Sequence, residues 1–260
     1  MTSYETSIGT SDPDTITVLG ADLARDLMGS VSFGELAFWL VAMRRPTPGE
    51  LHTFEAVLVA LADHGLTPSA IATRLTLTGA PESVQGALAA GILGGGSRFL
   101  GVTEDAGRFL AGAIAARDGD LPADAAEWDE LARGAVAEAK AAGRFVPGLG
   151  HPVHKVEDPR TPVLIRIATE DGVRGPHLAL FEAIGRVHPE VLGRTLPLNG
   201  AGVCGAVLAD LGFDAEILRG FALLARCAGL LGHIAEERRQ PVGMDIYAAV
   251  DRSATYLPPP

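Results

Sequence analysis

The chain has 260 residues, of which 47% are hydrophobic, so it is long enough to bury a core without disulfides or a structural metal. Its formal net charge of -11 argues against a nucleic acid or an anionic membrane as partner, because both require a basic surface at the contact. Cys204 and Cys227 are the only cysteines and lie in apolar sequence without metal-ligand spacing, so we expect reduced core thiols. Because the N-terminus is unlike a signal peptide and no run of about 18 apolar residues occurs, we expect a cytoplasmic protein.

Apolar residues recur at intervals of three and four along most of the chain, which predicts an all-α fold. Only the segment TITVLG, residues 15–20, alternates as a strand does. Residues 47–65 predict a helix, because Thr47 and Glu50 form a capping box at its start and Gly65 ends it. We expect His64 in the last turn of this helix, where the dipole favours an imidazolium.

Three more helices are expected further along the chain. The alanine-rich segment 121–143 ends at a glycine, and another helix opens on Asp158 and Pro159. Arginine at a helix start is unfavourable with the dipole, so Arg160 should have an anionic partner. The third helix, within residues 214–241, is predicted to be buried on most sides, because nearly all of its central residues are apolar or glycine.

The buried helix carries a narrow polar stripe. Arg219, Arg226 and His233 follow one another at intervals of seven residues, which is almost two turns, so they lie on one side of the helix. A solvated face is the alternative interpretation. Because leucines flank the stripe, we expect Arg226 and His233 to face a polar cavity rather than bulk water.

The segment GAGVCG, residues 200–205, matches the letters of a dinucleotide-binding motif. The preceding residues contain a proline and do not read as a strand, so we do not expect that site and assign the glycines to close backbone approach. Among the histidines, His52 and His188 lie in polar sequence and are expected at the surface. His177 is expected to cap its own helix.

The segment VPGLGHPVHKVEDPR, residues 146–160, concentrates groups that can bind an anion. Glycines and a proline restrict how the backbone presents His151, and Lys155 in the loop suits a phosphate. Arg160 then begins a helix whose N-terminus faces the same region. A basic exposed loop is the alternative. The residues therefore indicate a cationic site for a carboxylate or phosphate, without fixing a reaction.

Several ordered motifs resemble the citrate synthase superfamily. PGLGHPVHKVEDPR resembles its signature, in which a histidine after Gly-x-Gly is followed by a lysine or arginine and then Asp-Pro-Arg. ADHGLTPSAIATRL resembles the family's Asp-His segment, and LARCAGLLGHIAEE resembles its Ala-Arg-x-x-Gly-x-x-x-His helix. The N-terminal segment and the short length are most similar to the stand-alone citryl-CoA lyase branch, which is related to the C-terminal module of ATP-citrate lyase.

The resemblance implies an all-α, citrate synthase-like fold in which a large helical domain, residues 1–96 and 213–260, holds a smaller inserted helical domain, residues 97–212. It also implies a homodimer with acyl-CoA and carboxylate ligands in the cleft between the domains. Coenzyme A would enter as part of the thioester substrate, and neither a metal nor a nucleotide redox cofactor is expected. In the family an arginine from the partner chain binds the substrate. Arg238 or Arg239 would correspond to it, and the choice between the two stays open.

The resemblance also assigns roles to individual positions. His151 and His64 would be catalytic, and Lys155 would lie near the coenzyme A phosphates. The substrate would be held by Arg160, Arg226, His64 and Asn199, and the coenzyme by the backbone of Gly148, Leu149 and Gly150.

Two departures from the family bear on the reaction. Synthases place a catalytic histidine in Gly-Pro-Leu-His-Gly-Gly, where this chain reads GILGGGSRFLG; the citryl-CoA lyase branch also lacks it, which favours cleavage. Ala201 stands where the family has the aspartate that moves the proton at the acyl methyl group. Asp105, Asp210 or Glu104 could replace it, the substrate could differ, or the protein could bind without turnover.

The function we expect is a carbon–carbon lyase that cleaves a carboxylated 3-hydroxyacyl-CoA, similar to citryl-CoA, to an acyl-CoA and a ketoacid. In this interpretation His151 polarises the oxygen that becomes the ketone. Two alternatives remain: a citrate synthase-like condensing enzyme on a different acyl-CoA, and a non-catalytic protein that binds coenzyme A thioesters.

Overall fold

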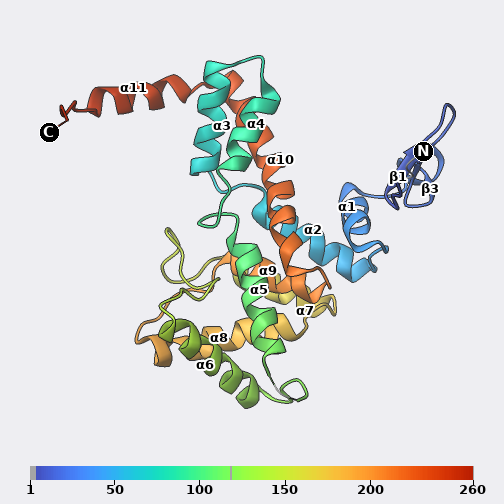
Figure 1. Cartoon of the computed structure of the whole chain (residues 1–260), viewed down its shortest axis with the longest axis vertical. Helices are drawn as coiled ribbons and strands as arrows, with labels where there is room; N and C mark the ends of the chain where they lie inside the picture. The colour runs from blue at the N-terminus through green and yellow to red at the C-terminus, as the bar shows by residue number, and fades with distance from the viewer. Residues whose placement is uncertain (1–3, 118, 260) are drawn as a thin grey trace.

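The computed structural model describes residues 4–117 and 119–259, and this part of the chain is mostly helical, as predicted (Figure 1). Its strands form one small antiparallel sheet in the order β1 (Gly9–Ser11), β2 (Ile16–Val18) and β3 (Ala21–Asp22). The predicted strand in residues 15–20 is β2, and its two neighbours were not expected.

The helices follow one another through the rest of the described chain. In order they are α1 (Phe33–Ala42), α2 (Pro48–Ala62), α3 (Pro68–Gly79), α4 (Val84–Leu93), α5 (Val102–Ala115), α6 (Ala125–Ala141), α7 (Arg160–Glu170), α8 (Pro176–Leu192), α9 (Gly200–Asp210), α10 (Leu218–Arg239) and α11 (Gly243–Ser253). A π-helical turn, Leu23–Leu27, precedes α1, and a 3₁₀ turn, Ala215–Ile217, leads into α10.

Local capping explains where α2 begins, and a side chain explains where it ends. Thr47 and Glu50 form the expected capping box. The helix ends at Ala62, because Asp63 has an extended backbone and its Oδ2 accepts the Gly65 N–H at 2.8 Å. The expectation that His64 lies in the last turn is therefore wrong: it follows the helix in a short connection to α3.

The helix α10 is the central element and packs against α2, α3, α4 and α5. By length and composition it could cross a membrane, but these contacts identify it as a core helix. The aromatic rings of Phe54 and Phe221 meet edge to face at 5.1 Å between centroids and join α2 to α10. Burial of each phenylalanine contributes about 1.5–3 kcal/mol, so this contact fixes the two helices that border the site.

Figure 1 shows how the remaining helices are placed. Helices α3 and α4 lie beside the C-terminal half of α10, α5 and α9 lie beside its N-terminal half, and α6 and α8 pack against each other beyond them. The small sheet and α11 extend from the molecule in different directions. His64 and His151 lie in connections between helices, whereas Arg160 begins α7 and Arg226 lies on α10.

Three expectations about single side chains need comment. His188 is buried, not at the surface, because its ring bonds to the Ile184 oxygen and the Leu196 N–H, both at 2.9 Å. His177 does not cap its helix: the carboxylate of Asp210 accepts the N–H groups at the start of α8 and also binds the His177 ring. Cys204 is a free, buried thiol as expected, and its burial raises its pKa to about 12.

Candidate active site

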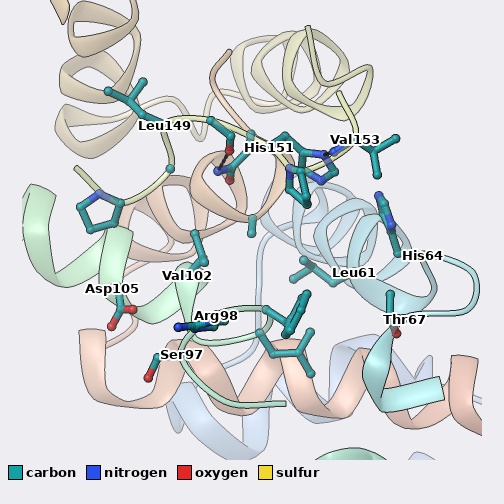
Figure 2. Close-up of a pocket in the computed structure, with 18 of the residues that line it drawn as sticks. Leu61, His64, Thr67, Ser97, Arg98, Val102, Asp105, Leu149, His151 and Val153 are labelled. Carbon is teal, nitrogen blue, oxygen red and sulfur yellow. Dashed lines mark hydrogen bonds between the residues drawn. The ribbon is translucent and has the colours of Figure 1, made fainter. Parts of the chain in front are cut away.

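A cavity of about 720 Å³ opens between the two groups of helices (Figure 2). Its walls come from segments far apart in the sequence: the α2–α3 connection, residues 97–102, the loop at 145–153, the starts of α7 and α9, and the middle of α10. The cavity brings together His64, His151, Arg160, Asn199 and Arg226, together with the backbone of Gly148, Leu149 and Gly150. These are the residues selected from the sequence, and their roles stay predictions.

Lys155 is placed differently from the others. It is exposed, lies outside the lining of the cavity, and its Nζ donates to the His151 carbonyl oxygen at 3.0 Å. Its ammonium group therefore stabilises the loop that presents His151. A contact with coenzyme A phosphates stays a prediction.

The loop before His151 is held by the start of α9. Asn199 caps α9 through its Oδ1, which accepts the Gly202 N–H, and its Nδ2 donates to the Gly150 oxygen at 2.8 Å. The backbone of Asn199 also donates to the Gly148 oxygen at 2.8 Å. Gly148 has a φ of +89°, a conformation that favours glycine. Asn199 thus positions the loop as well as lining the cavity.

The ring of His151 is held in one tautomer. Its Nδ1 accepts two backbone N–H groups, from Val153 at 3.1 Å and from His154 at 2.9 Å. An unprotonated Nδ1 leaves the proton of the neutral ring on Nε2. Burial lowers the pKa of His151, and the neighbouring histidines and Arg160 lower it further against the opposing effect of Asp158. A neutral His151 therefore donates one hydrogen bond through Nε2.

Two more imidazole rings surround His151. The ring centroids of His151 and His154 are 4.4 Å apart, and the His64 ring lies 5.3 Å from His151 and 5.7 Å from His154. Burial lowers the pKa of His64, and Arg160, His154 and Arg226 lower it further. The expectation of an imidazolium at His64 is therefore wrong, since the surroundings favour the neutral ring.

The three histidines have the spacing of a metal site but not its hydrogen bonds. One nitrogen from each ring lies within 4.8 Å of the others. A metal on Nε2 of His151 would require the ring proton to sit on Nδ1, where two backbone N–H groups already point. The group fits a hydrogen-bonding cluster better than a metal centre. His154 was not selected from the sequence, although its spacing from His151 in HPVH was a visible signal.

Arg160 has the anionic partner that its position at a helix start predicts. Its Nε and one terminal nitrogen bind the two oxygens of Asp158 at 3.0 and 2.7 Å, and the other donates to the Ala60 oxygen at 3.2 Å. Asp158 is fully buried and also accepts the Gly200 N–H at 2.7 Å. Burial alone would raise the pKa of Asp158, but Arg160 and Gly200 hold it well below its usual range. This pair is therefore close to neutral overall.

Arg226 differs because no described carboxylate forms an ion pair with it. Its guanidinium is 5% exposed, and its Nε donates to the Leu61 oxygen at 3.3 Å. Burial lowers the pKa of Arg226, and Arg160 adds to that effect while Asp63 opposes it. An arginine nevertheless stays charged in proteins. Arg226 thus supplies the cavity with a positive charge that an anionic ligand can neutralise.

The other two members of the polar stripe on α10 do not line the cavity. His233 does not line it, contrary to expectation, and binds Asp63 and the buried Arg74 instead. Arg219 pairs with Glu104 at 3.1 Å. The three side chains lie on one side of α10, as predicted. Two of them, Arg219 and His233, bind side chains from other parts of the fold.

The cavity holds one carboxylate among its described lining residues, Asp105. Of the other two candidates for a missing acid or base, Asp210 caps α8 and Glu104 is paired with Arg108 and Arg219. Figure 2 shows Asp105 across the cavity from His64, near Ser97 and Arg98. Ala201 also lines the cavity and has no ionisable group.

Comparisons with known proteins found a matching family model and similar structures. The family model for the citrate synthase C-terminal domain matches residues 26–246. The structure is similar to citryl-CoA lyase from Hydrogenobacter thermophilus, with a TM-score of 0.85 and 30% identity over 99% of this chain and 95% of that one. It is also similar in fold to ATP citrate lyase from Methanothrix soehngenii in complex with citrate and coenzyme A, with a TM-score of 0.79 and 24% identity over 100% of this chain and 42% of that one.

A sequence relative is longer than this chain. The probable ATP-citrate synthase of Dictyostelium discoideum is 24% identical over 96% of this chain, which spans 41% of that protein.

Proposed function

This chain belongs to the citrate synthase superfamily, and from that premise we propose that it is a carbon–carbon lyase acting on a carboxylated 3-hydroxyacyl-CoA similar to citryl-CoA. The observation that carries the proposal is the tautomer of His151. A neutral ring that donates through Nε2 suits a carbonyl or alkoxide oxygen, and the charge of Arg226 in the same cavity suits a carboxylate.

In the proposed reaction the bond between C2 and C3 of the acyl chain breaks. The hydroxyl group on C3 loses its proton to a base, its oxygen becomes the carbonyl of the ketoacid, and the electron pair of the broken bond passes to the thioester as an enolate. His151 stabilises the oxygen through Nε2. His64, kept neutral by its burial, is the group we assign as the base.

The enolate must then gain a proton at carbon to become the acyl-CoA product. Ala201 cannot supply one, so another donor is required. Asp105 is the carboxylate that lines the cavity, and a water molecule beside Ala201 is the alternative donor. The balance of the reaction needs no oxidant or reductant, since one proton is lost from oxygen and one is gained at carbon.

Coenzyme A stays bound in the thioester throughout the reaction and is released as part of the acyl-CoA product. The cavity extends from the polar groups toward an apolar region with Leu100, Val102 and Val146, which has room for an extended chain. We assign the carboxylates of the substrate to Arg226 and Arg160, and the coenzyme to the backbone of the 148–150 loop and Lys155. We also propose a homodimer in the cytoplasm, with Arg238 or Arg239 reaching the neighbouring site.

The test is an assay of the purified protein with (3S)-citryl-CoA that follows acetyl-CoA and oxaloacetate together. His151→Ala should lower turnover more than binding, because the hydrogen bond strengthens as charge develops on oxygen. His177→Ala is the matched control, because His177 is another partly buried histidine and lies outside the cavity. An equal loss of turnover and binding in His151→Ala would contradict its role.

A second candidate follows from Ala201. If citryl-CoA binds but no product forms, the protein either acts on another acyl-CoA or serves as a non-catalytic thioester-binding protein. A panel of acyl-CoA substrates separates these outcomes. The condensing direction is tested with the same proteins by supplying acetyl-CoA and oxaloacetate and following free coenzyme A.

A further inference from the structure

A chain of polar side chains runs from the start of α11 to the connection that holds His64; three of its members are buried, and the last, Asp63, has a half-exposed side chain. It comprises Glu237, Arg74, His233 and Asp63, which we call the Arg74 relay. Arg74 is 2% exposed and Glu237 is 5% exposed, so the two charges are removed from water together. Buried charges of this kind require full sets of partners, and each member of the relay has them.

The hydrogen bonds of the relay are donated in one direction, from Arg74 to His233 and from His233 to Asp63. Arg74 donates to Glu237 at 2.9 Å, to Nδ1 of His233 at 2.9 and 3.1 Å, and to Glu236. Arginine cannot accept a hydrogen bond, so Nδ1 of His233 is the acceptor and the ring proton sits on Nε2. That nitrogen lies 2.9 Å from Oδ1 of Asp63 and donates to it.

The last step reaches the backbone that carries His64. Oδ2 of Asp63 accepts the Gly65 N–H at 2.8 Å, so one carboxylate bridges His233 and the residue after His64. The Gly65 N–H lowers the pKa of Asp63 against the opposing effect of burial, and the His233 ring lowers it further. The carboxylate is thereby kept charged in its bridging position.

The packing of α10 supports the same connection. A Cβ on Gly229 would lie 2.1 Å from the Ala62 oxygen, so α10 approaches the end of α2 as closely as a glycine allows. Arg226 is three residues before Gly229, His233 is four residues after it, and all three lie on one side of the helix. Arg226 binds the Leu61 oxygen, and His233 binds Asp63. One face of α10 therefore holds the three residues that precede His64.

We propose that His233 and Arg74 are positioning residues that hold His64 in its working orientation through Asp63. Neither lines the cavity, so they act through His64 and not on a ligand. The inference rests on the proposed function for the role of His64 in turnover. The claim that His233 sets the orientation of the His64 ring does not depend on that function.

The first experiment is a mutant cycle in turnover of (3S)-citryl-CoA. His233→Ala should lower kcat roughly ten- to hundredfold with a smaller change in KM, since a misplaced base costs rate. In a background of His64→Ala, the same substitution should have no further effect on kcat. Independent, multiplying losses would overturn the proposal, as would an unchanged kcat in His233→Ala.

Conservative and control variants separate positioning from general damage. His233→Gln keeps a donor at the position of Nε2 and should recover part of kcat. His177→Ala removes another histidine that lies 2.9 Å from an aspartate, away from the cavity, and should leave kcat unchanged. If His233→Gln and His233→Ala lose kcat equally while both remain folded, the donor to Asp63 does not matter and the proposal fails.

The second experiment does not require activity. The ring ¹⁵N signals of His64, assigned by their absence in His64→Ala, report its tautomer and its pKa. In His233→Ala these signals should shift, and in His177→Ala they should not. Unchanged His64 signals in folded His233→Ala would overturn the proposal even if no substrate is ever found. Shifted signals in a protein without lyase activity would sustain the positioning role and reject the proposed reaction.

Discussion

Gly202 lies against Gly148 so closely that a Cβ on Gly202 would fall 2.5 Å from the Gly148 Cα. This contact joins the first turn of α9 to the loop that presents His151. The glycines of the segment 200–205 thus allow the close backbone approach that the sequence suggested.

Replacing Gly202 with alanine should destabilise the protein and displace the His151 loop. Overpacking of this kind costs about 1–3 kcal/mol, which urea unfolding can measure. Gly134→Ala is the control, because nothing lies within 4 Å of its added Cβ in α6. That variant should instead be more stable by about 0.5–1 kcal/mol, as expected for glycine in a helix. Equal effects at the two positions would contradict the close contact.

Replacing Arg74 with methionine should cost about 3–5 kcal/mol, because it leaves the buried Glu237 without its partner. The free energy of unfolding in urea is the measurement. Arg166→Ala removes an exposed pair with Glu170 and should leave that free energy nearly unchanged. A small loss in Arg74→Met would mean that Glu237 is neutralised in another way.

The acid side of the stability curve should depend on Asp158. Its pKa in the folded protein lies well below the ordinary aspartate value of 3.8, because, against the effect of burial, Arg160 and the Gly200 N–H stabilise the carboxylate. A carboxyl group of this kind stabilises the folded state above its unfolded pKa, and the contribution is lost as the pH falls through the folded pKa. The free energy of unfolding should therefore decrease below about pH 5. Asp158→Asn should flatten this decrease, whereas an unchanged slope would assign it to other carboxylates.

The histidines of the cavity set the expected pH dependence of activity. The pKa of both His64 and His151 lies below the ordinary value of 6.5, so the neutral ring predominates for both at that pH. The acid limb of kcat/KM should accordingly have its midpoint below 6.5. A midpoint above that value would mean that a protonated histidine is not the cause of the loss.

Introducing a carboxylate at position 201 tests our expectation that Ala201 stands where the family has its aspartate. Ala201 lines the cavity, and Ala201→Asp should raise turnover of citryl-CoA by about 10²-fold or more if proton transfer to carbon is slow. Ala201→Asn has nearly the same shape without the ionisable group and should not. If Ala201→Asp lowers turnover, the protein already transfers this proton by another route.

Local signals in the sequence predicted the helix starts well, because caps such as Thr47 and Glu50 act within one turn. The end of α2 was misplaced because Asp63 is held by His233, 170 residues away, and no local pattern records that bond. His188 was misassigned for the same reason: its partner is the Leu196 N–H beyond the helix end. Arg74 lies in an ordinary helix sequence, so nothing in its neighbourhood marks it as buried.

The cavity residues were found because several motifs carried them together. Composition alone led to a cationic site and not to a reaction. The pairing of Arg160 with Asp158 inside one motif is local and could be anticipated from the helix start. Whether a carboxylate pairs with Arg226 depends on how distant helices pack, so the lack of an ion pair there among the described residues could not be anticipated from the sequence.

The bond between Arg226 and the Leu61 oxygen joins residues separated by 165 positions. During synthesis, α2 therefore leaves the ribosome long before the helix that completes its C-terminal end. Until α10 arrives, the Leu61 oxygen lacks its bond from Arg226, Oδ1 of Asp63 lacks its bond from His233, and the cavity lacks one wall. The growing chain can consequently bind a ligand only late in synthesis. Helices such as α6 and α8 can pack against each other before α10 is made. A ligand that recognises this cavity would bind only chains in which α10 has docked, and would stabilise that final step.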